Sequence, residues 1–122
     1  MIKGFSLDIY DCDVTFAWNT NEKEINAFFD KVEAPEDYRN GFWENYNDEK
    51  IGALTTLYSD TNVFCVFGCE PNNKVVAHEI YHIAYNILKT RRIEDEEAWA
   101  YLIGYLTEMF YDYLYLEDGE LA

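Results

Sequence analysis

The first part of the chain has the residue pattern of strands. Residues 5–18 are rich in β-branched and aromatic residues and are interrupted by polar residues at 11–13. This composition predicts two strands joined by a turn. Residues 51–68 repeat the pattern around the turn sequence SDTN and predict a second hairpin. Its second strand, NVFCVF at residues 62–67, is an almost continuous apolar run.

A helix and a loop are expected between these strand regions. Residues 19–32 offer Asn19 or Thr20 as an N-cap, followed by apolar residues at helical spacing. Residues 33–50 are rich in acids, asparagines and aromatics and contain Pro35. We expect a loop there, with at most a short turn of helix.

Two longer helical patterns follow, at residues 70–92 and 93–116. The first ends in cations and the second begins with acids, as the helix dipole favours. One apolar stripe of the first helix should face the core: Val76, Ile80, Ile83 and Ile87. The order of elements predicts an α+β fold in a single domain, residues 1–122. Antiparallel strands with one helix come first, and two long helices come last.

Charge narrows the possible partners. The chain has 24 acidic and 9 basic residues, a formal net charge of −15. Nucleic acid and anionic membrane surfaces are disfavoured, because both attract basic proteins. The first residues lack the apolar region of a signal peptide, and no stretch approaches the ~18 apolar residues of a membrane span. We therefore expect a cytoplasmic protein, whose three cysteines are reduced, structural thiols.

The only two histidines of the chain lie in the sequence VVAHEIYH, at residues 75–82. On a helix, His78 and His82 project from one face, one turn apart, so both can bind one metal ion. Glu79 is displaced by about 100° around the axis and can reach a water molecule on that metal. Two imidazoles with a carboxylate suit zinc, and we expect one zinc ion per chain.

A catalytic zinc site has three protein ligands and one open position. No further histidine exists, so a carboxylate or a thiol must complete the set. We expect Glu97 from the next helix, on a stripe with Tyr101, Gly104 and Glu108, where Gly104 would allow close approach of the two helices. The competing ligands are three neighbouring acids and one thiol: Glu94, Asp95, Glu96 and Cys69. For most of these acids, a solvated helix N-terminus is the simpler explanation.

HEIYH and the downstream EAWAY, residues 97–101, resemble motifs of the zincin metallopeptidases, in particular their glutamate-zincin branch. EEAWAYLIGYL is also similar to a helix in short HExxH proteins of phage and bacterial genomes. The resemblance spans about residues 75–106. It implies His78, His82 and Glu97 as zinc ligands and Glu79 as general base. Tyr101 stands where the larger family has Asp or Asn, so the resemblance implies metal binding more firmly than catalysis.

The sequence therefore predicts a zinc-dependent peptidase that acts on a protein or peptide substrate, and the negative charge of the chain favours a substrate with a basic surface. Tyr81, Tyr85 or Tyr101 could donate a hydrogen bond to the developing oxyanion or support a ligand, although tyrosines more often serve packing. The strand at residues 62–67 could pair with an extended substrate if it lies at a sheet edge, or it could be an interior strand. Two alternatives stay open: a non-catalytic acidic protein-binding module on a zincin scaffold, and a hydrolase of non-peptide amides.

Overall fold

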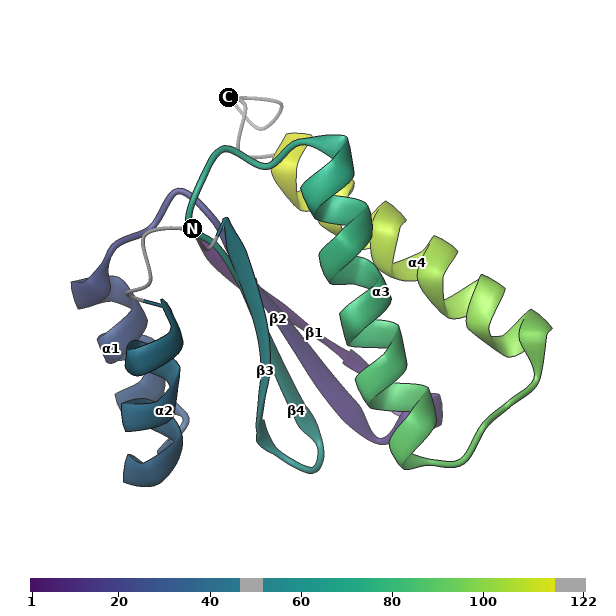
Figure 1. Cartoon of the computed structure of the whole chain (residues 1–122), viewed down its shortest axis with the longest axis horizontal. Coiled ribbons are helices and arrows are strands. Elements are labelled where there is room, and N and C mark those ends of the chain that lie inside the picture. The colour runs from purple at the N-terminus through teal and green to yellow at the C-terminus, as the bar shows by residue number, and fades with distance from the viewer. Residues whose placement is uncertain (47–51, 116–122) are drawn as a thin grey trace. The chain divides into compact units, whose positions relative to one another are not determined.

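The computed structural model describes residues 1–46 and 52–115 (Figure 1). The chain divides into two compact units, residues 1–71 and residues 72–122. That the whole chain acts as one domain stays a prediction. The elements of the first unit follow in chain order: β1 (Ile2–Leu7), a 3₁₀ turn (Asp8–Tyr10), β2 (Cys12–Ala17), α1 (Glu22–Lys31), α2 (Glu36–Tyr46), β3 (Ala53–Ser59) and β4 (Asn62–Phe67). The second unit contains α3 (Asn73–Thr90) and α4 (Glu96–Tyr115).

The four strands form one mixed sheet in the order β1-β2-β4-β3. Both predicted hairpins are confirmed, because β1 pairs with β2 and β3 pairs with β4 in antiparallel fashion. The two hairpins join through a parallel pairing of β2 with β4, which the sequence analysis did not predict. Strand β4 is therefore interior, and its use as an edge for an extended substrate is ruled out. Its continuous apolar run fits a strand that is buried on both faces.

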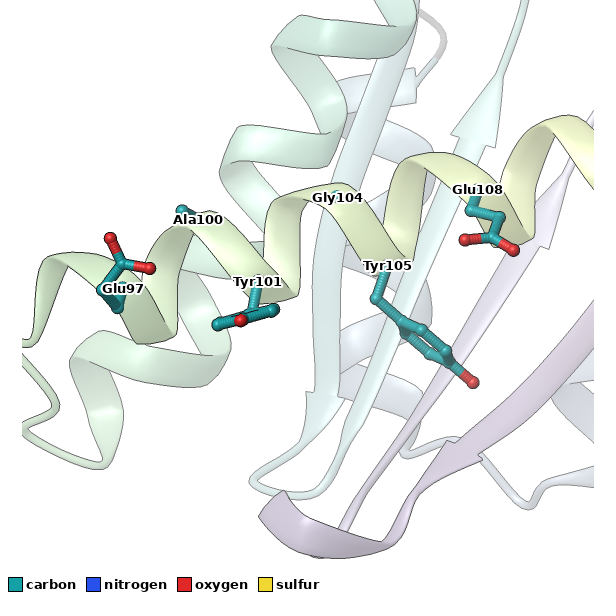
Figure 2. Close-up of a pocket in the computed structure, with 6 residues that line it drawn as sticks. All are labelled: Glu97, Ala100, Tyr101, Gly104, Tyr105 and Glu108. Atoms are coloured by element: carbon teal, nitrogen blue, oxygen red, sulfur yellow. The ribbon is translucent and has the colours of Figure 1, made fainter.

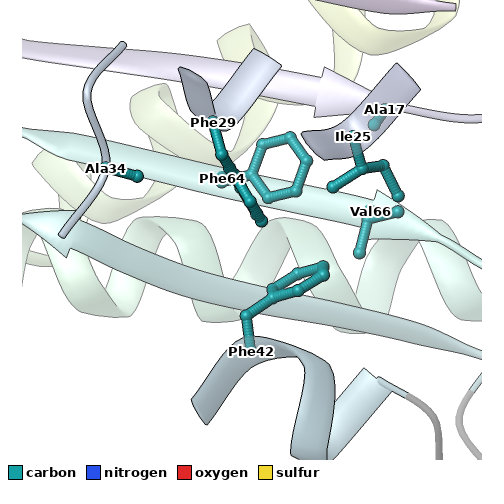
Figure 3. Packing of buried hydrophobic residues seen from close by; sticks show 7 residues of the cluster. All are labelled: Ala17, Ile25, Phe29, Ala34, Phe42, Phe64 and Val66. Carbon is teal, nitrogen blue, oxygen red and sulfur yellow. The ribbon is translucent and has the colours of Figure 1, made fainter. Parts of the chain in front are cut away.

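Helices α1 and α2 cover one face of this sheet with an aromatic core. Phe29 of α1, Phe42 of α2 and Phe64 of β4 contact one another with ring centroids 5.1 to 5.7 Å apart (Figure 3). All three side chains are buried. Such aromatic pairs each add about 0.5–1.5 kcal/mol beyond the burial of their area.

The prediction of a loop at residues 33–50 is wrong for residues 36–46, which form α2. Pro35 directly precedes the helix, where a missing amide hydrogen costs nothing. Glu36 and Asp37 occupy the first turn, where the helix dipole favours acids. Packing of Phe42 then stabilises a helix whose intrinsic pattern is weak. Residues 33–35 form a turn and loop as expected, and residues 47–50 lie outside the described residues.

The N-cap of α1 is Asn21 and not Asn19 or Thr20. The Asn21 side chain accepts a hydrogen bond from the Glu24 amide at 2.9 Å. Asn19 has a φ of 48°, the left-handed conformation, whereas a helix N-cap is extended. The predicted helix is confirmed, with a start shifted by one to two residues.

The second unit is an antiparallel pair of helices. The side chain of Tyr111, late in α4, donates a hydrogen bond to Asn73 at the start of α3. At the other end, the ring of Trp99 in the first turns of α4 contacts the rings of Tyr81 and Tyr85. Both predicted C-terminal helices are thereby confirmed. The expected apolar stripe of the first is buried in full: Val76, Ile80, Ile83 and Ile87. No helix in the described part of the chain is long and apolar enough to cross a membrane.

Candidate metal site

Helix α3 carries the histidine pair on the face opposite to its buried apolar stripe. Asn72 caps the helix, with its side-chain oxygen accepting a hydrogen bond from the Val75 amide at 3.0 Å. The helix begins at Asn73, three residues after the start of the predicted helical pattern at residue 70. With the apolar stripe buried, the face that bears His78 and His82 is exposed. The helical geometry expected from the HExxH spacing is confirmed.

The two imidazole rings converge on one point. The Nε2 atoms of His78 and His82 lie 3.0 Å apart, and the ring centroids are 4.6 Å apart. Without a metal, one ring would donate the shared hydrogen and the other would accept it. The His78 side chain is 67% exposed, so solvent and ligands have access to it.

Glu79 approaches the same point from the buried side. One carboxylate oxygen, Oε2, lies 3.9 Å from His78 Nε2, while the residue is only 5% exposed. The ligand atoms of His78, Glu79 and His82 all lie within 4.8 Å of one another. A buried carboxylate costs free energy unless hydrogen bonds or a positive charge offset its lost hydration. Glu79 already takes part in an interaction within the chain, and a metal cation beside the histidines would add a favourable charge next to it.

The distances fit a small tetrahedral metal ion. Zinc–nitrogen bonds of about 2.0–2.1 Å at a tetrahedral angle place two ligand nitrogens ~3.3–3.4 Å apart. The observed nitrogen separation of 3.0 Å is within a few tenths of an ångström of that value. Glu79 lies farther from His78 Nε2, at 3.9 Å, than a second ligand of such an ion would lie. The three residues could hold a metal, with Glu79 either as a loose ligand or one water molecule away.

Glu97 lies on an exposed face of α4 and not in this group. Together with five neighbours it lines a hollow along the helix (Figure 2): Ala100, Tyr101, Gly104, Tyr105 and Glu108. The structure brings His78, Glu79 and His82 together but does not add Glu97 to them. Its role as third ligand stays a prediction.

The expected function of Gly104 is wrong. A Cβ atom built at Gly104 would meet no atom of the described chain within 4 Å. The glycine therefore borders open space, and it does not allow close approach of α3 to α4. On α4 the buried residues are Leu102, Leu106 and Phe110, which lie on the opposite side of the helix from this glycine.

The other competing ligands have local hydrogen bonds or are solvated. The Asp95 side chain accepts a hydrogen bond from the Glu97 amide at 3.0 Å and thereby caps α4. Glu94 and Glu96 are exposed. The Cys69 thiol donates to the backbone oxygen of Gly52 at 3.3 Å, within the first unit.

The tyrosines expected near the site divide into two groups. The rings of Tyr81 and Tyr85 pack 6.0 and 6.2 Å from the ring of Trp99, which itself donates a hydrogen bond to the Ile93 carbonyl. Tyr101 is 77% exposed on α4 and lines the hollow. A catalytic or supporting role for any of them stays a prediction. Trp99 is not among the predicted site residues, although two tyrosines spaced i, i+4 and a tryptophan in the next helix could have indicated this contact.

Comparisons with protein-family models, with curated proteins and with solved structures found no match. The resemblance to zincins therefore rests on the HExxH sequence and on its placement on a helix.

Proposed function

We propose that this chain is a zinc-dependent, metallopeptidase-like hydrolase of protein substrates. The observation that carries the proposal is the convergence of the His78 and His82 Nε2 atoms, 3.0 Å apart, beside the buried carboxylate of Glu79. Two imidazoles and a nearby carboxylate are the donor set that zinc hydrolases use. The sequence places these groups on one helix at the spacing that this chemistry needs.

Each residue has a defined part in the proposed reaction. His78 and His82 hold the zinc ion through Nε2. When bound, zinc lowers the pKa of a coordinated water toward ~7 and polarises a substrate carbonyl. Glu79 accepts a proton at a carboxylate oxygen from the attacking water and passes it to the leaving amine. Its buried position keeps the carboxylate oriented toward the histidines.

A third protein ligand would complete a catalytic centre. Glu97 is the proposed residue, on the strength of its sequence context. If Glu97 does not bind zinc, a water molecule or a substrate group would complete the coordination, and the site would bind zinc more weakly. The comparison of Glu97→Ala with variants of its neighbours separates these two cases.

The second candidate function is a protein-binding module on the same scaffold. One observation favours it: α4 exposes a face of tyrosines and acids that is not part of the histidine group. In this case the histidine pair would hold a structural metal or none, and the chain would act by docking.

The test of the hydrolase is activity that depends on zinc. Protein purified without a histidine tag would be divided into chelated, zinc-restored and untreated samples and incubated with a mixture of unfolded proteins. New N-termini, read by mass spectrometry, should appear in the untreated and restored samples only. A sample that holds one zinc per chain yet produces no new termini would contradict the hydrolase and favour the docking module.

A further inference from the structure

The exposed face of α4 combines aromatic rings with carboxylates. The rings of Tyr101 and Tyr105 are 77% and 45% exposed, and Glu97 and Glu108 lie one turn beyond them at either end (Figure 2). Gly104 adds no side chain to this face and borders open space. Together with Ala100, these residues line a shallow hollow that is wide open to solvent.

Two exposed tyrosines one helical turn apart place aromatic area side by side on this face. Among the other exposed tyrosines of these helices, Tyr81 and Tyr85 pack against Trp99, and Tyr115 packs against a neighbouring tyrosine. Within the described residues, Tyr101 has no ring partner of this kind. An amphipathic tyrosine that is open to solvent offers contact area at a small entropic cost and is typical of binding surfaces.

Charge decides which class of partner fits this hollow. A second copy of the chain would bring another formal charge of −15 to an acidic face, and the two copies would repel each other. Nucleic acid and anionic membranes are repelled for the same reason. A cationic side chain is attracted both by the carboxylates and by the faces of the tyrosine rings.

We propose that this α4 face, lined by Tyr101, Gly104, Tyr105 and Glu108, docks a basic segment of another protein. One arginine or lysine would lie against the Tyr105 ring and pair with Glu108, which is one helical turn away. A second would lie against Tyr101. Asp112, exposed one turn beyond Glu108, adds negative charge at that end. The surface does not depend on Glu97, so it can operate whether or not Glu97 binds zinc.

Helix geometry sets the spacing of the cations. Tyr101 and Tyr105 are four positions apart, which is about 6 Å along the helix at ~1.5 Å per residue. An extended segment covers that length in about two residues at ~3.3 Å per residue, and residues two apart point to the same face. The proposal therefore favours basic residues two apart in an extended segment.

The direct test is the binding of a fluorescent hexa-arginine peptide to the full chain, measured by fluorescence anisotropy. A hexa-citrulline peptide, which has the same shape without the charge, is the ligand control. Replacing both Tyr101 and Tyr105 by alanine should weaken hexa-arginine binding by about tenfold, as expected from the loss of two cation–π contacts. Glu108→Gln should weaken it several-fold, and added salt should weaken it further.

Matched variants distinguish the hollow from general attraction to an acidic protein. Tyr115→Ala removes an exposed tyrosine of the same helix, and Glu96→Gln removes an exposed carboxylate; neither residue lines the hollow. Both should bind the peptide within about twofold of the wild type. Gly104→Leu should fill the hollow and abolish the tyrosine-dependent part of binding while it keeps the helix, as circular dichroism would show.

Three outcomes would overturn the proposal. Equal losses from Glu108→Gln and Glu96→Gln would show attraction by net charge alone. Equal binding of the arginine and citrulline peptides would show that charge does not select the ligand. A dimer in sedimentation that Tyr101→Ala dissociates would make a second copy the occupant of this face.

Discussion

Replacement of Glu79 by glutamine separates metal binding from proton transfer. The residue is only 5% exposed, and glutamine keeps the size of the side chain while removing its charge and its ability to accept a proton. Ligands of one tetrahedral zinc ion lie ~3.3–3.4 Å apart, whereas Glu79 Oε2 lies 3.9 Å from His78 Nε2. This excess of about half an ångström favours a Glu79 that acts through an intervening water molecule over one that coordinates zinc directly.

The expected result is a large loss of rate with little loss of metal. A general base contributes about 10²–10⁴-fold, so Glu79→Gln should lower the cleavage rate at least ~100-fold, or about 2.7 kcal/mol of barrier. Zinc affinity should change much less, because both histidines remain. The assay measures bound zinc and cleavage rate on the same preparations, with Glu96→Gln as an exposed carboxylate control.

Two results would refute this reasoning about Glu79. Loss of zinc from Glu79→Gln, with the fold intact by circular dichroism, would make Glu79 a ligand. A variant that cleaves as fast as the wild type would show that another group accepts the proton.

Three further predictions concern the third ligand, the glycines and the alkaline limit of stability. Glu97→Ala should weaken zinc binding at least about tenfold, since it removes a proposed ligand, while Glu96→Ala should leave zinc binding unchanged. If a zinc competition titration gives the two variants equal affinities, Glu97 is not a ligand. Gly104→Ala should raise the free energy of unfolding by about 1 kcal/mol through helix propensity, because a Cβ there meets no described atom within 4 Å. Gly4→Ala should lower the free energy of unfolding, because the new Cβ would approach a side-chain oxygen of β2 to 2.9 Å. Urea unfolding that ranks the two variants in the opposite order would contradict both glycine predictions. Burial raises the pKa of Tyr38 from 10.0 to about 12, so the folded state holds the phenolic proton more tightly than the unfolded state does. The contribution of Tyr38 to stability is therefore full below pH 10 and should be lost as the pH rises toward 12. Tyr38→Phe should reduce this alkaline loss in urea unfolding measured across that range, and an unchanged pH profile would show that Tyr38 does not contribute.

The parts of the fold that depend on local pattern were predictable from the sequence. Alternation and turn residues marked both hairpins, and the spacing of Val76, Ile80, Ile83 and Ile87 marked the buried face of α3. Once that face is buried, the exposed position of the histidines follows from 3.6 residues per turn. The pairing of β2 with β4 depends on contacts between distant segments, so no local pattern could reveal it.

Helix α2 and the exposed position of Gly104 beside Glu97 were not predicted correctly from the sequence. The α2 segment has few apolar residues, and it is helical because Phe42 packs against Phe29 and Phe64. Helical spacing places Glu97 and Gly104 on one stripe of α4, but spacing alone does not determine whether that stripe faces α3 or solvent. The ring of Trp99 faces Tyr81 and Tyr85 instead. A stripe of mixed character carries no apolar signal that would fix its orientation.

The most direct test of the central claim is the zinc content of the purified, tag-free protein. After incubation with excess zinc and removal of free metal, elemental analysis should find close to one zinc per chain. His78→Ala and His82→Ala should each lose that zinc, while Glu94→Ala, which removes an exposed acid, should keep it. Wild-type protein that stays free of zinc, or histidine variants that bind as much as the wild type, would contradict the assignment of the histidine pair as a metal site.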